Sequence, residues 1–278
     1  MNLAISFYRI ITRGGGGRMK ASKHLSITYT DKNVAIVKMN HKKSCKFLHS
    51  SLMKELIIAF EKLNEDKKIP CIILTGVEET FLSGIAVKEL TGISVSEAYK
   101  IARKMKTLQR LMLDSPKPYI AAINGHCLGA GMELALVCDI ALAGQKAMFG
   151  LPEVNFGIIP GGGGISRITE IAGKSNASKM IFTGELISAA KALEFKLVSD
   201  VVDDPLESSI ILANSLATKS KLAIATAKKL INRKYLHENH QGDIEQEMYA
   251  FSLMFDYPDS VEGMGAFLEK RNPIFKNE

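Results

Sequence analysis

The chain has 278 residues, of which 46% are hydrophobic and 23% are charged. This composition excludes a disordered or fibrous chain, and the length is sufficient to bury a substantial apolar core. No apolar run reaches the ~18 residues that a membrane span requires. The four cysteines form no C-x-x-C pair, and Cys71 and Cys138 lie inside apolar runs. This usage indicates buried thiols, and neither a disulfide framework nor a zinc site.

The net charge of +7 is concentrated near the N-terminus. Residues 1–30 carry five basic side chains and no acidic one, because the first acid is Asp31. The rest of the chain has 31 basic and 29 acidic side chains, a balance that is ordinary for a globular enzyme.

Residues 1–18 (MNLAISFYRIITRGGGGR) are predicted to lie outside the fold, as a leader or disordered arm. Three interpretations stay open: translation from an upstream start before Met19, an Arg-rich mitochondrial targeting peptide, or a native flexible arm. We expect a cytoplasmic protein, or one of the mitochondrial matrix if residues 1–18 are a targeting peptide. The rest is predicted to divide into a core at 19–204 and a C-terminal helical region at 205–278.

Short strands and longer helices alternate from Leu25 onward. The elements predicted are strands at 25–30 and 34–39 around a turn at 31–33, a helix at 49–64, a strand at 71–75, a helix from a capping box at Ser94 and Glu97 to Asp114, and a strand at 119–123. This alternation predicts an α/β core with parallel pairing. After residue 204 only helical patterns follow, at 205–219, 221–236, 243–255 and 258–271.

The most informative stretch is residues 124–164, NGHCLGAGMELALVCDIALAGQKAMFGLPEVNFGIIPGGGG. Glycines permit a tight turn there, followed by a helix from Ala130 to Cys138 that is apolar on every side and therefore buried. Glu133 stands in its first turn, where free N–H groups and the helix dipole favour an anion. The alternative, a glutamate directed to water, is disfavoured because the helix offers no polar face.

Glu153 is a second candidate carboxylate, in a loop bracketed by glycine and proline. Alone it reads as a solvated loop acid. Paired with Glu133 in an apolar setting it could divide acid and base work, because burial and a neighbouring charge separate two carboxyl pKa values. The Gly-rich helix start, and a second Gly turn at 81–85, could supply N–H groups to an oxyanion. Acyl-group chemistry through an enolate needs that arrangement.

Several segments together resemble the enoyl-CoA hydratase/isomerase (crotonase) family, most closely an enoyl-CoA hydratase. They are NG and GAGMEL within 124–134, FGLPE at 149–153, GIIPG at 157–161, TG at 183–184 and EGMGAFLEKRNPIF at 262–275. The resemblance covers residues 25–275, and the two glutamate motifs stand at the family's spacing of 20 residues.

The resemblance implies an α/β fold, a spiral of ββα units that forms two sheets, with a C-terminal helical trimerisation region. It implies a homotrimer or homohexamer and a hydratase of the fatty-acid β-oxidation type that adds water across the 2,3 double bond of a 2-enoyl-CoA. We expect no metal and no cofactor besides the coenzyme A of the substrate, an acyl-CoA thioester as partner, and neither a membrane nor a nucleic acid.

The resemblance also implies roles for individual residues. Glu133 and Glu153 would be catalytic, and the backbone N–H groups of Ile85 and Ala130 would form the oxyanion hole. Coenzyme A would be bound by Lys43, Ser44, Cys45, Lys46, Phe267 and Lys270, and the acyl group by Ser83, Gly84, Lys88, Gly129 and Gly161. Without the family match, Lys42, Lys43 and Lys46 would equally suit a solvated charge run.

Three positions depart from the family pattern. Ala86 replaces an Asp that could cap the next turn, lysines at 42 and 46 replace Pro and Asn of the adenine pocket, and Lys196 replaces a glycine, where a positive φ would strain the backbone by about 1 kcal/mol.

Two other functions stay open. The first is a Δ3,Δ2-enoyl-CoA isomerase or another acyl-CoA lyase of this fold, and the second is an RNA-binding protein on the same fold. The glycine run at 161–164 is better read as a packing turn than as a phosphate cradle, because no Lys-Ser/Thr follows it.

Overall fold

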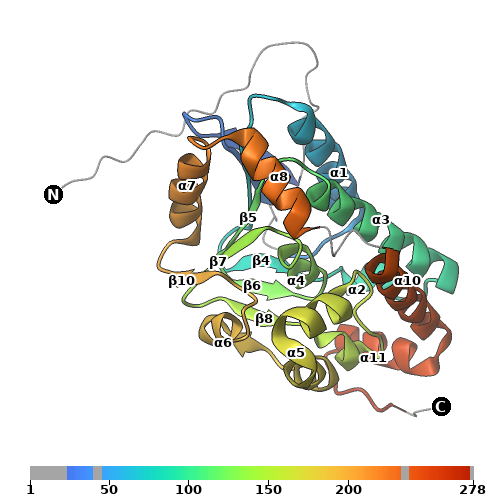
Figure 1. Ribbon diagram of the computed structural model, residues 1–278. Coiled ribbons are helices and arrows are strands. Elements are labelled where there is room, and N and C mark those ends of the chain that lie inside the picture. Colours follow the sequence, from blue (N-terminus) through green and yellow to red (C-terminus); the bar gives the residue numbers. More distant parts are fainter. Residues whose placement is uncertain (1–23, 40–45, 233–237, 276–278) are drawn as a thin grey trace.

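The computed structural model describes residues 24–39, 46–232 and 238–275 (Figure 1). The chain begins with a hairpin, in which β1 (Leu25–Tyr29) pairs antiparallel with β2 (Ala35–Met39). The predicted turn between them places Asn33 at a φ of 62°, which asparagine tolerates better than most residues. The hairpin is therefore specified by its local sequence.

Two sheets form the centre of the molecule. The larger has the order β1-β2-β3-β5-β7-β10, with β3 (Ile72–Thr75), β5 (Tyr119–Ile123), β7 (Ile140–Gly144) and β10 (Asp200–Val202). The smaller has the order β4-β6-β8-β9, with β4 (Thr80–Ser83), β6 (His126–Leu128), β8 (Met148–Gly150) and β9 (Ile187–Ser188). Apart from β1–β2 and β8–β9, all pairs are parallel.

The chain crosses from one sheet to the other three times in succession. In each case a strand of the larger sheet is followed by one of the smaller: β3 by β4, β5 by β6 and β7 by β8. Helices complete these turns: α2 (Val87–Leu90) and α3 (Val95–Leu113) after β4, α4 (Ala130–Ala135) after β6, and 3-10 helix η1 (Pro152–Phe156) with α5 (Gly164–Thr183) after β8. This succession of ββα units confirms the predicted spiral.

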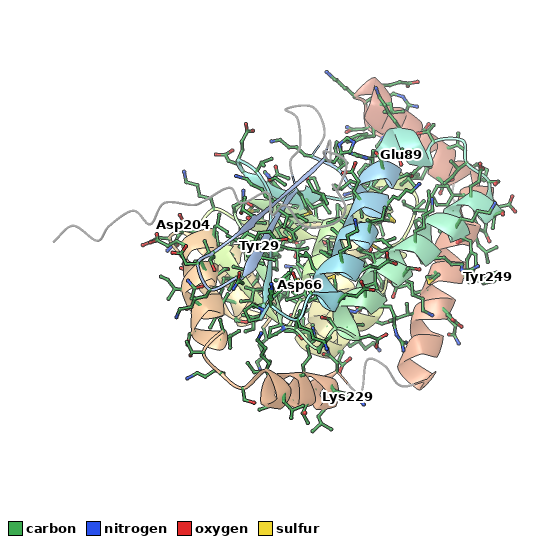
Figure 2. All side chains as sticks on the ribbon, turned by 90° about the horizontal axis from the view of Figure 1, so that it is seen from above. Tyr29, Asp66, Glu89, Asp204, Lys229 and Tyr249 are labelled. Atoms are coloured by element: carbon green, nitrogen blue, oxygen red, sulfur yellow. The ribbon has the colours of Figure 1, made fainter. Side chains whose placement is uncertain are left out.

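Helices cover both faces of the larger sheet (Figure 1). Alternate strand residues such as Ile72 and Leu74 face the main core with α1 (Ser50–Glu65) and α3, while Ile73 and Ile120 face α7 (Pro205–Leu216). Figure 2 shows α7, beside Asp204, and α10 (Glu238–Leu253), which carries Tyr249, on opposite sides of the molecule. The predicted capping box of α3 is present, with Ser94 and Glu97 bonding each other's backbone.

The described residues from 205 to 269 are mainly helical and contain no strand, as predicted. This region contains α7, α8 (Lys221–Ile231), α10, the 3-10 helix η2 (Met254–Asp256) and α11 (Pro258–Glu269); α6 (Ala189–Glu194) precedes it. Because α10 packs on α3 and α5, and α11 packs on η1, these helices contribute to the body of the protein. The trimerisation role and the division at residue 204 stay predictions.

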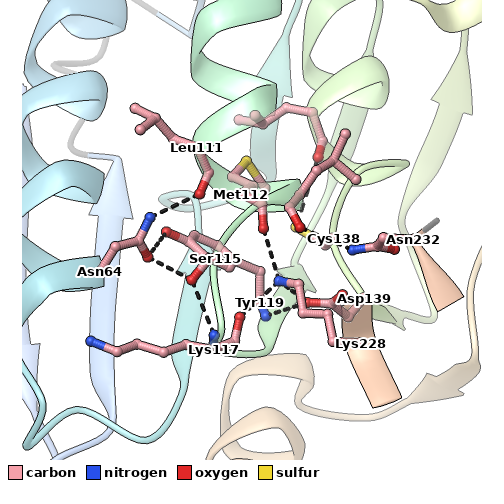
Figure 3. A network of polar contacts seen from close by, with 12 residues as sticks. Asn64, Leu111, Met112, Ser115, Lys117, Tyr119, Cys138, Asp139, Lys228 and Asn232 are labelled. Atoms are coloured by element: carbon pink, nitrogen blue, oxygen red, sulfur yellow. Dashed lines mark hydrogen bonds and ion pairs between the residues drawn. The ribbon is translucent and has the colours of Figure 1, made fainter. Parts of the chain in front are cut away.

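A buried lysine attaches α8 to this body (Figure 3). Lys228 Nζ donates to the carbonyl oxygens of Met112 and Lys117 and forms an ion pair with Asp139 Oδ2, each at 2.8 Å. The same Asp139 oxygen accepts the backbone N–H of Tyr119 at 2.7 Å. One lysine thus joins α8, the end of α3 and the start of β5.

The helix predicted from Ala130 to Cys138 is shorter than expected. α4 ends at Ala135, and two tight turns follow, closed by N–H donation from Val137 to the carbonyl of Leu134 and from Cys138 to that of Ala135. The Gly turn predicted at 81–85 is shorter than expected, because Phe81, Leu82 and Ser83 belong to strand β4 and the turn is confined to the last two residues.

Two of the positions that depart from the family pattern lie in the described residues. Lys196 has a positive φ of 63°, so the strain that a side chain brings there is present, and Ala86 precedes α2 without a side-chain cap. Cys71, Cys127 and Cys138 are free thiols. Among the described residues, no helix combines the length and apolarity that crossing a bilayer needs. Residues 1–18, Lys42, Lys43, Ser44 and Cys45 lie outside the described ranges.

Candidate active site

An apolar cavity of about 210 Å³ lies where the smaller sheet meets α3 and the C-terminal helices. Its lining includes Ser83, Gly84 and Ile85 after β4, Gly129, Ala130 and Glu133 at the start of α4, Pro152, Glu153 and Phe156 of η1, Ala102 and Met105 of α3, Gly161 and Gly162, Phe251 of α10 and Phe267 of α11. Both candidate carboxylates and both candidate oxyanion donors therefore border the same space.

Two glycine turns meet at one wall of this cavity. Gly84 has a φ of 83° and Gly129 a φ of 52°, conformations that L side chains rarely adopt. A Cβ on Gly129 would lie 3.3 Å from the Cα of Gly84 and 2.7 Å from Glu153 Oε1. Only glycine permits the two turns to approach each other and Glu153 so closely.

The N–H groups after these two glycines are available as donors. Neither Ile85 nor Ala130 donates its N–H to another described residue, and Ala130 opens α4, where the first N–H groups have no partner within the helix. Because both residues line the cavity, an oxygen atom inside it could accept from both.

Glu133 is held by the start of α5. The side chain is 3% exposed, and its Oε1 accepts the N–H of Gly162 at 2.8 Å and that of Gly164 at 3.0 Å. A Cβ on Gly162 would lie 2.5 Å from Oε2, and one on Gly164 would lie 2.8 Å from Oε1. The glycine run predicted as a packing turn therefore does cradle an anion, which is the protein's own carboxylate.

The groups around Glu133 have opposite effects on its pKa. Burial raises its pKa to about 7, and the charge of Glu247 acts in the same direction. The amides of Gly162 and Gly164 and the guanidinium of Arg167 act against this rise, because they stabilise the charged form. The group therefore titrates close to neutral pH.

Glu153 has much less support for a negative charge. It lies in η1, and its Oε2 atom is sealed from solvent without a hydrogen-bond partner in the described part of the chain. Burial, and then the charge of Glu133, raise its pKa well above the ordinary value. The two carboxylates thus differ in how readily they ionise, and Glu133 is the more readily ionised of the two.

The predicted acyl-pocket residues are largely assembled. Ser83, Gly84, Gly129 and Gly161 line the cavity, whereas Lys88 lies exposed on α2 and is not brought to the lining.

The predicted coenzyme A residues are only partly placed. Phe267 lines the cavity and packs edge to face on Phe156, with ring centroids 5.2 Å apart. The carbonyl of Lys46 accepts the N–H of Ser83 at 2.9 Å, so Lys46 is next to the cavity. Lys270 caps the end of α11 and lies outside the lining.

Two charged residues behind Glu133 were missed from the sequence. Arg167, 2% exposed, donates from Nη1 to the carbonyl of Gly162 at 2.9 Å. Glu247, 7% exposed, accepts the N–H groups of Ile165 and Ser166. The described residues contain no cluster of three His, Cys, Asp or Glu side chains arranged to hold a metal.

A family model described as enoyl-CoA hydratase/isomerase matches residues 29–278. The sequence is 37% identical over 257 residues to a protein of Dictyostelium discoideum named "Probable enoyl-CoA hydratase, mitochondrial", with 91% of each chain covered. It is also 37% identical over 252 residues to 2,3-dehydroadipyl-CoA hydratase of Escherichia coli, which covers 90% of this chain and 98% of that protein.

Solved structures show the same similarity. An enoyl-CoA hydratase of Bacillus anthracis superposes with a TM-score of 0.73 at 33% identity, covering 92% of this chain and 100% of that one. A carnitinyl-CoA hydratase of Mycobacterium avium gives a TM-score of 0.79 at 27% identity, covering 92% and 99%.

Proposed function

The chain belongs to the enoyl-CoA hydratase/isomerase family, and we propose that it is a 2-enoyl-CoA hydratase of the fatty-acid β-oxidation type. The observation that carries this proposal is the pairing of Glu133 and Glu153 with the free N–H groups of Ile85 and Ala130 around one apolar cavity. Hydratase names among relatives that cover about nine tenths of the chain support the same activity.

The two carboxylates take opposite roles in this proposal. Glu133 is the base, because two backbone amides and Arg167 favour its ionised form. Glu153 is the acid, because its buried Oε2 has no described partner to stabilise a charge. A water molecule between them would face one group that accepts a proton and one that donates.

The oxyanion hole and the two carboxylates then act on the substrate together. The thioester oxygen accepts hydrogen bonds from Ile85 and Ala130, which stabilise the charge that develops on it as an enolate. Glu133 takes a proton from water, the hydroxide oxygen bonds to C3, and Glu153 gives its proton to C2. The proton gained by Glu133 must return to Glu153 before the next turnover.

The coenzyme A of the substrate would extend from the cavity mouth. Phe267 lines the cavity and Lys46 adjoins it through Ser83, which supports a role for both in binding coenzyme A. We extend the same role to Lys43, Ser44, Cys45 and Lys270, where lysine would act as a point charge for phosphate. Lys88 is more suited to a contact outside the cavity than to one with the acyl chain.

Assembly and location belong to the same proposal. The family resemblance implies a homotrimer or homohexamer, and light scattering would measure the oligomeric state. The Arg-bearing residues 1–18, together with a relative named as mitochondrial, support import into the mitochondrial matrix. N-terminal sequencing of the native protein would test this by showing whether it begins after residue 18.

The activity is tested by following 2-enoyl-CoAs from C4 to C16, and matched 3-enoyl-CoAs, to their products. We expect 3-hydroxyacyl-CoA from the 2-enoyl series. Conversion of 3-enoyl to 2-enoyl-CoA without hydration would contradict the proposal and favour the isomerase. The presence of both carboxylates favours hydration, because delivering OH and a proton to two carbons uses two groups.

A further inference from the structure

A third carboxylate, Glu247, lies behind the Glu133 and Glu153 pair. It comes from the C-terminal helix α10, which packs along α3 and against α5 (Figure 1). Its Oε1 accepts the N–H of Ile165 at 3.3 Å, and its Oε2 accepts the N–H and the hydroxyl of Ser166, both at 3.1 Å. Glu247 therefore caps α5 from another helix.

The first turn of α5 is divided between two acids. The N–H groups of Gly162 and Gly164 point to Glu133, and the next two, from Ile165 and Ser166, point to Glu247. Arg167 also holds this turn, because it donates a hydrogen bond to the carbonyl of Gly162, the residue whose N–H donates to Glu133. A shift of Glu247 would therefore displace the amides that hold Glu133.

We propose that Glu247 is a positioning residue for Glu133, which it serves by holding, together with Arg167, the Gly162–Ser166 turn against the Glu133 carboxylate. Glu247 does not line the cavity, so it acts through the turn and not on the substrate. This inference rests on the proposed role of Glu133 as the base.

Glu247 also acts on Glu133 through its charge. Glu133 faces Arg167 from α5, Glu153 from η1 and Glu247 from α10, while α3 presents the uncharged Met105 and Gln109. The charge of Glu247 raises the pKa of Glu133, and the charge of Arg167 lowers it. On the outer side of α10, Glu245 pairs with Lys106 of α3 at 2.8 Å.

The test is Glu247→Gln, which keeps the shape and one acceptor but removes the charge. We expect the acidic limb of the kcat/KM profile with crotonyl-CoA to move to lower pH, because the glutamine oxygen still keeps the Gly162 and Gly164 amides near Glu133 while the like charge is lost. We also expect kcat at the optimum to fall about tenfold, with KM within twofold of wild type, because a neutral acceptor holds the turn less firmly than a carboxylate does. Glu245→Gln, a surface change two residues away, is the matched control and should leave the profile unchanged.

A second readout does not depend on turnover. In protein labelled with 13C at the glutamate carboxyl carbons, the NMR titration that disappears in Glu133→Gln reports Glu133. We expect this titration to move to lower pH in Glu247→Gln. If the protein fails to hydrate any enoyl-CoA, the proposed function fails, while the titration still tests the link between Glu247 and Glu133.

The inference is overturned if Glu247→Gln loses thermal stability but keeps the wild-type titration and pH profile, because Glu247 would then be a helix cap only. If Glu247→Gln does not fold, Ser166→Ala takes its place. It removes one of the three hydrogen bonds that stabilise the Glu247 charge, so Glu247 ionises less readily, and a smaller shift in the same direction is expected. An unchanged Glu133 titration in Ser166→Ala would overturn the inference.

Discussion

The N–H of Gly162 donates a 2.8 Å hydrogen bond to Oε1 of Glu133, and the same glycine leaves no room for a side chain beside Oε2. A backbone turn therefore determines where this carboxylate lies. The carboxylate sits in the first turn of α4, and the amide precedes α5, so the contact also joins two helices.

Gly162→Ala should damage activity while the protein stays folded. The added Cβ would lie 2.5 Å from Glu133 Oε2 and 2.9 Å from Met105 Cγ, so the carboxylate must move. A displacement near 1 Å reduces rates about 10²-fold, which we expect for kcat. Gly265→Ala, where a Cβ meets nothing within 4 Å, is the control. A wild-type kcat in Gly162→Ala would show that the placement of Glu133 is not critical.

The rate of hydration should have a bell-shaped dependence on pH. Glu133 must be ionised to act as base, so kcat/KM should rise as the pH increases through about 7, the pKa to which burial raises this group. Glu153 must be protonated to act as acid, so the rate should fall at higher pH, above its raised pKa. A profile that is flat from pH 5 to pH 9 would be inconsistent with these roles.

Glu133 should also lower the free energy of unfolding at alkaline pH, where this buried carboxyl group is charged. Its pKa is near 7 in the folded state and near 4.5 when unfolded, so the folded protein binds the extra proton between these values. The contribution is therefore fully present below pH 4.5 and is lost as the pH rises through 7. Relative to wild type, Glu133→Gln should gain up to about 3 kcal/mol in unfolding free energy between pH 4.5 and pH 8, measured in urea. An equal pH dependence in both proteins would refute the raised pKa.

Ala130→Pro should remove one oxyanion donor with little damage to the helix. Ala130 is the first residue of α4, a position where proline is well tolerated because its N–H has no helical partner. We expect kcat to fall about 10²- to 10³-fold. Lys221→Pro, at the same position of the exposed start of α8, controls for the proline itself. A folded Ala130→Pro enzyme with the wild-type kcat would exclude this N–H from the oxyanion hole.

Lys228→Met should destabilise the protein strongly. It removes one partner of the buried pair with Asp139 and leaves two carbonyl oxygens without their donor. We expect the free energy of unfolding to fall by about 3 to 5 kcal/mol. Lys229→Met, at the exposed neighbouring position, should change it by less than about 0.5 kcal/mol. Equal urea midpoints for the two variants would contradict the structural role of Lys228.

Elements with local signals were predictable from the sequence, and those defined by distant partners were not. The Asn33 turn and the Ser94 capping box are local, and both are present. Strands β6 and β8 have three residues each and are strands because Cys127 pairs with Phe149 across the smaller sheet. A segment of three residues is too short for its sequence pattern to predict that pairing.

The candidate site also combines features with a local sequence signal and features that depend on distant partners. Burial of Glu133 was predictable because its helix has no polar face, but its contact with the glycine run depends on how α5 packs. Glu247 was missed because α10 reads as a polar helix. Its one signal is spacing, since Ile244, Met248 and Phe251 form a buried stripe that also contains Glu247.

The central claim is that Glu133 and Glu153 act together on one water molecule. The most direct test measures crotonyl-CoA hydration by wild type, Glu133→Gln, Glu153→Gln and the double variant, with folding checked by thermal unfolding. Each single change should reduce kcat by about 10²- to 10⁴-fold, and the double variant should lose much less than the product of the two, because each proton transfer needs the other group. Full activity in a folded Glu153→Gln enzyme would contradict the account.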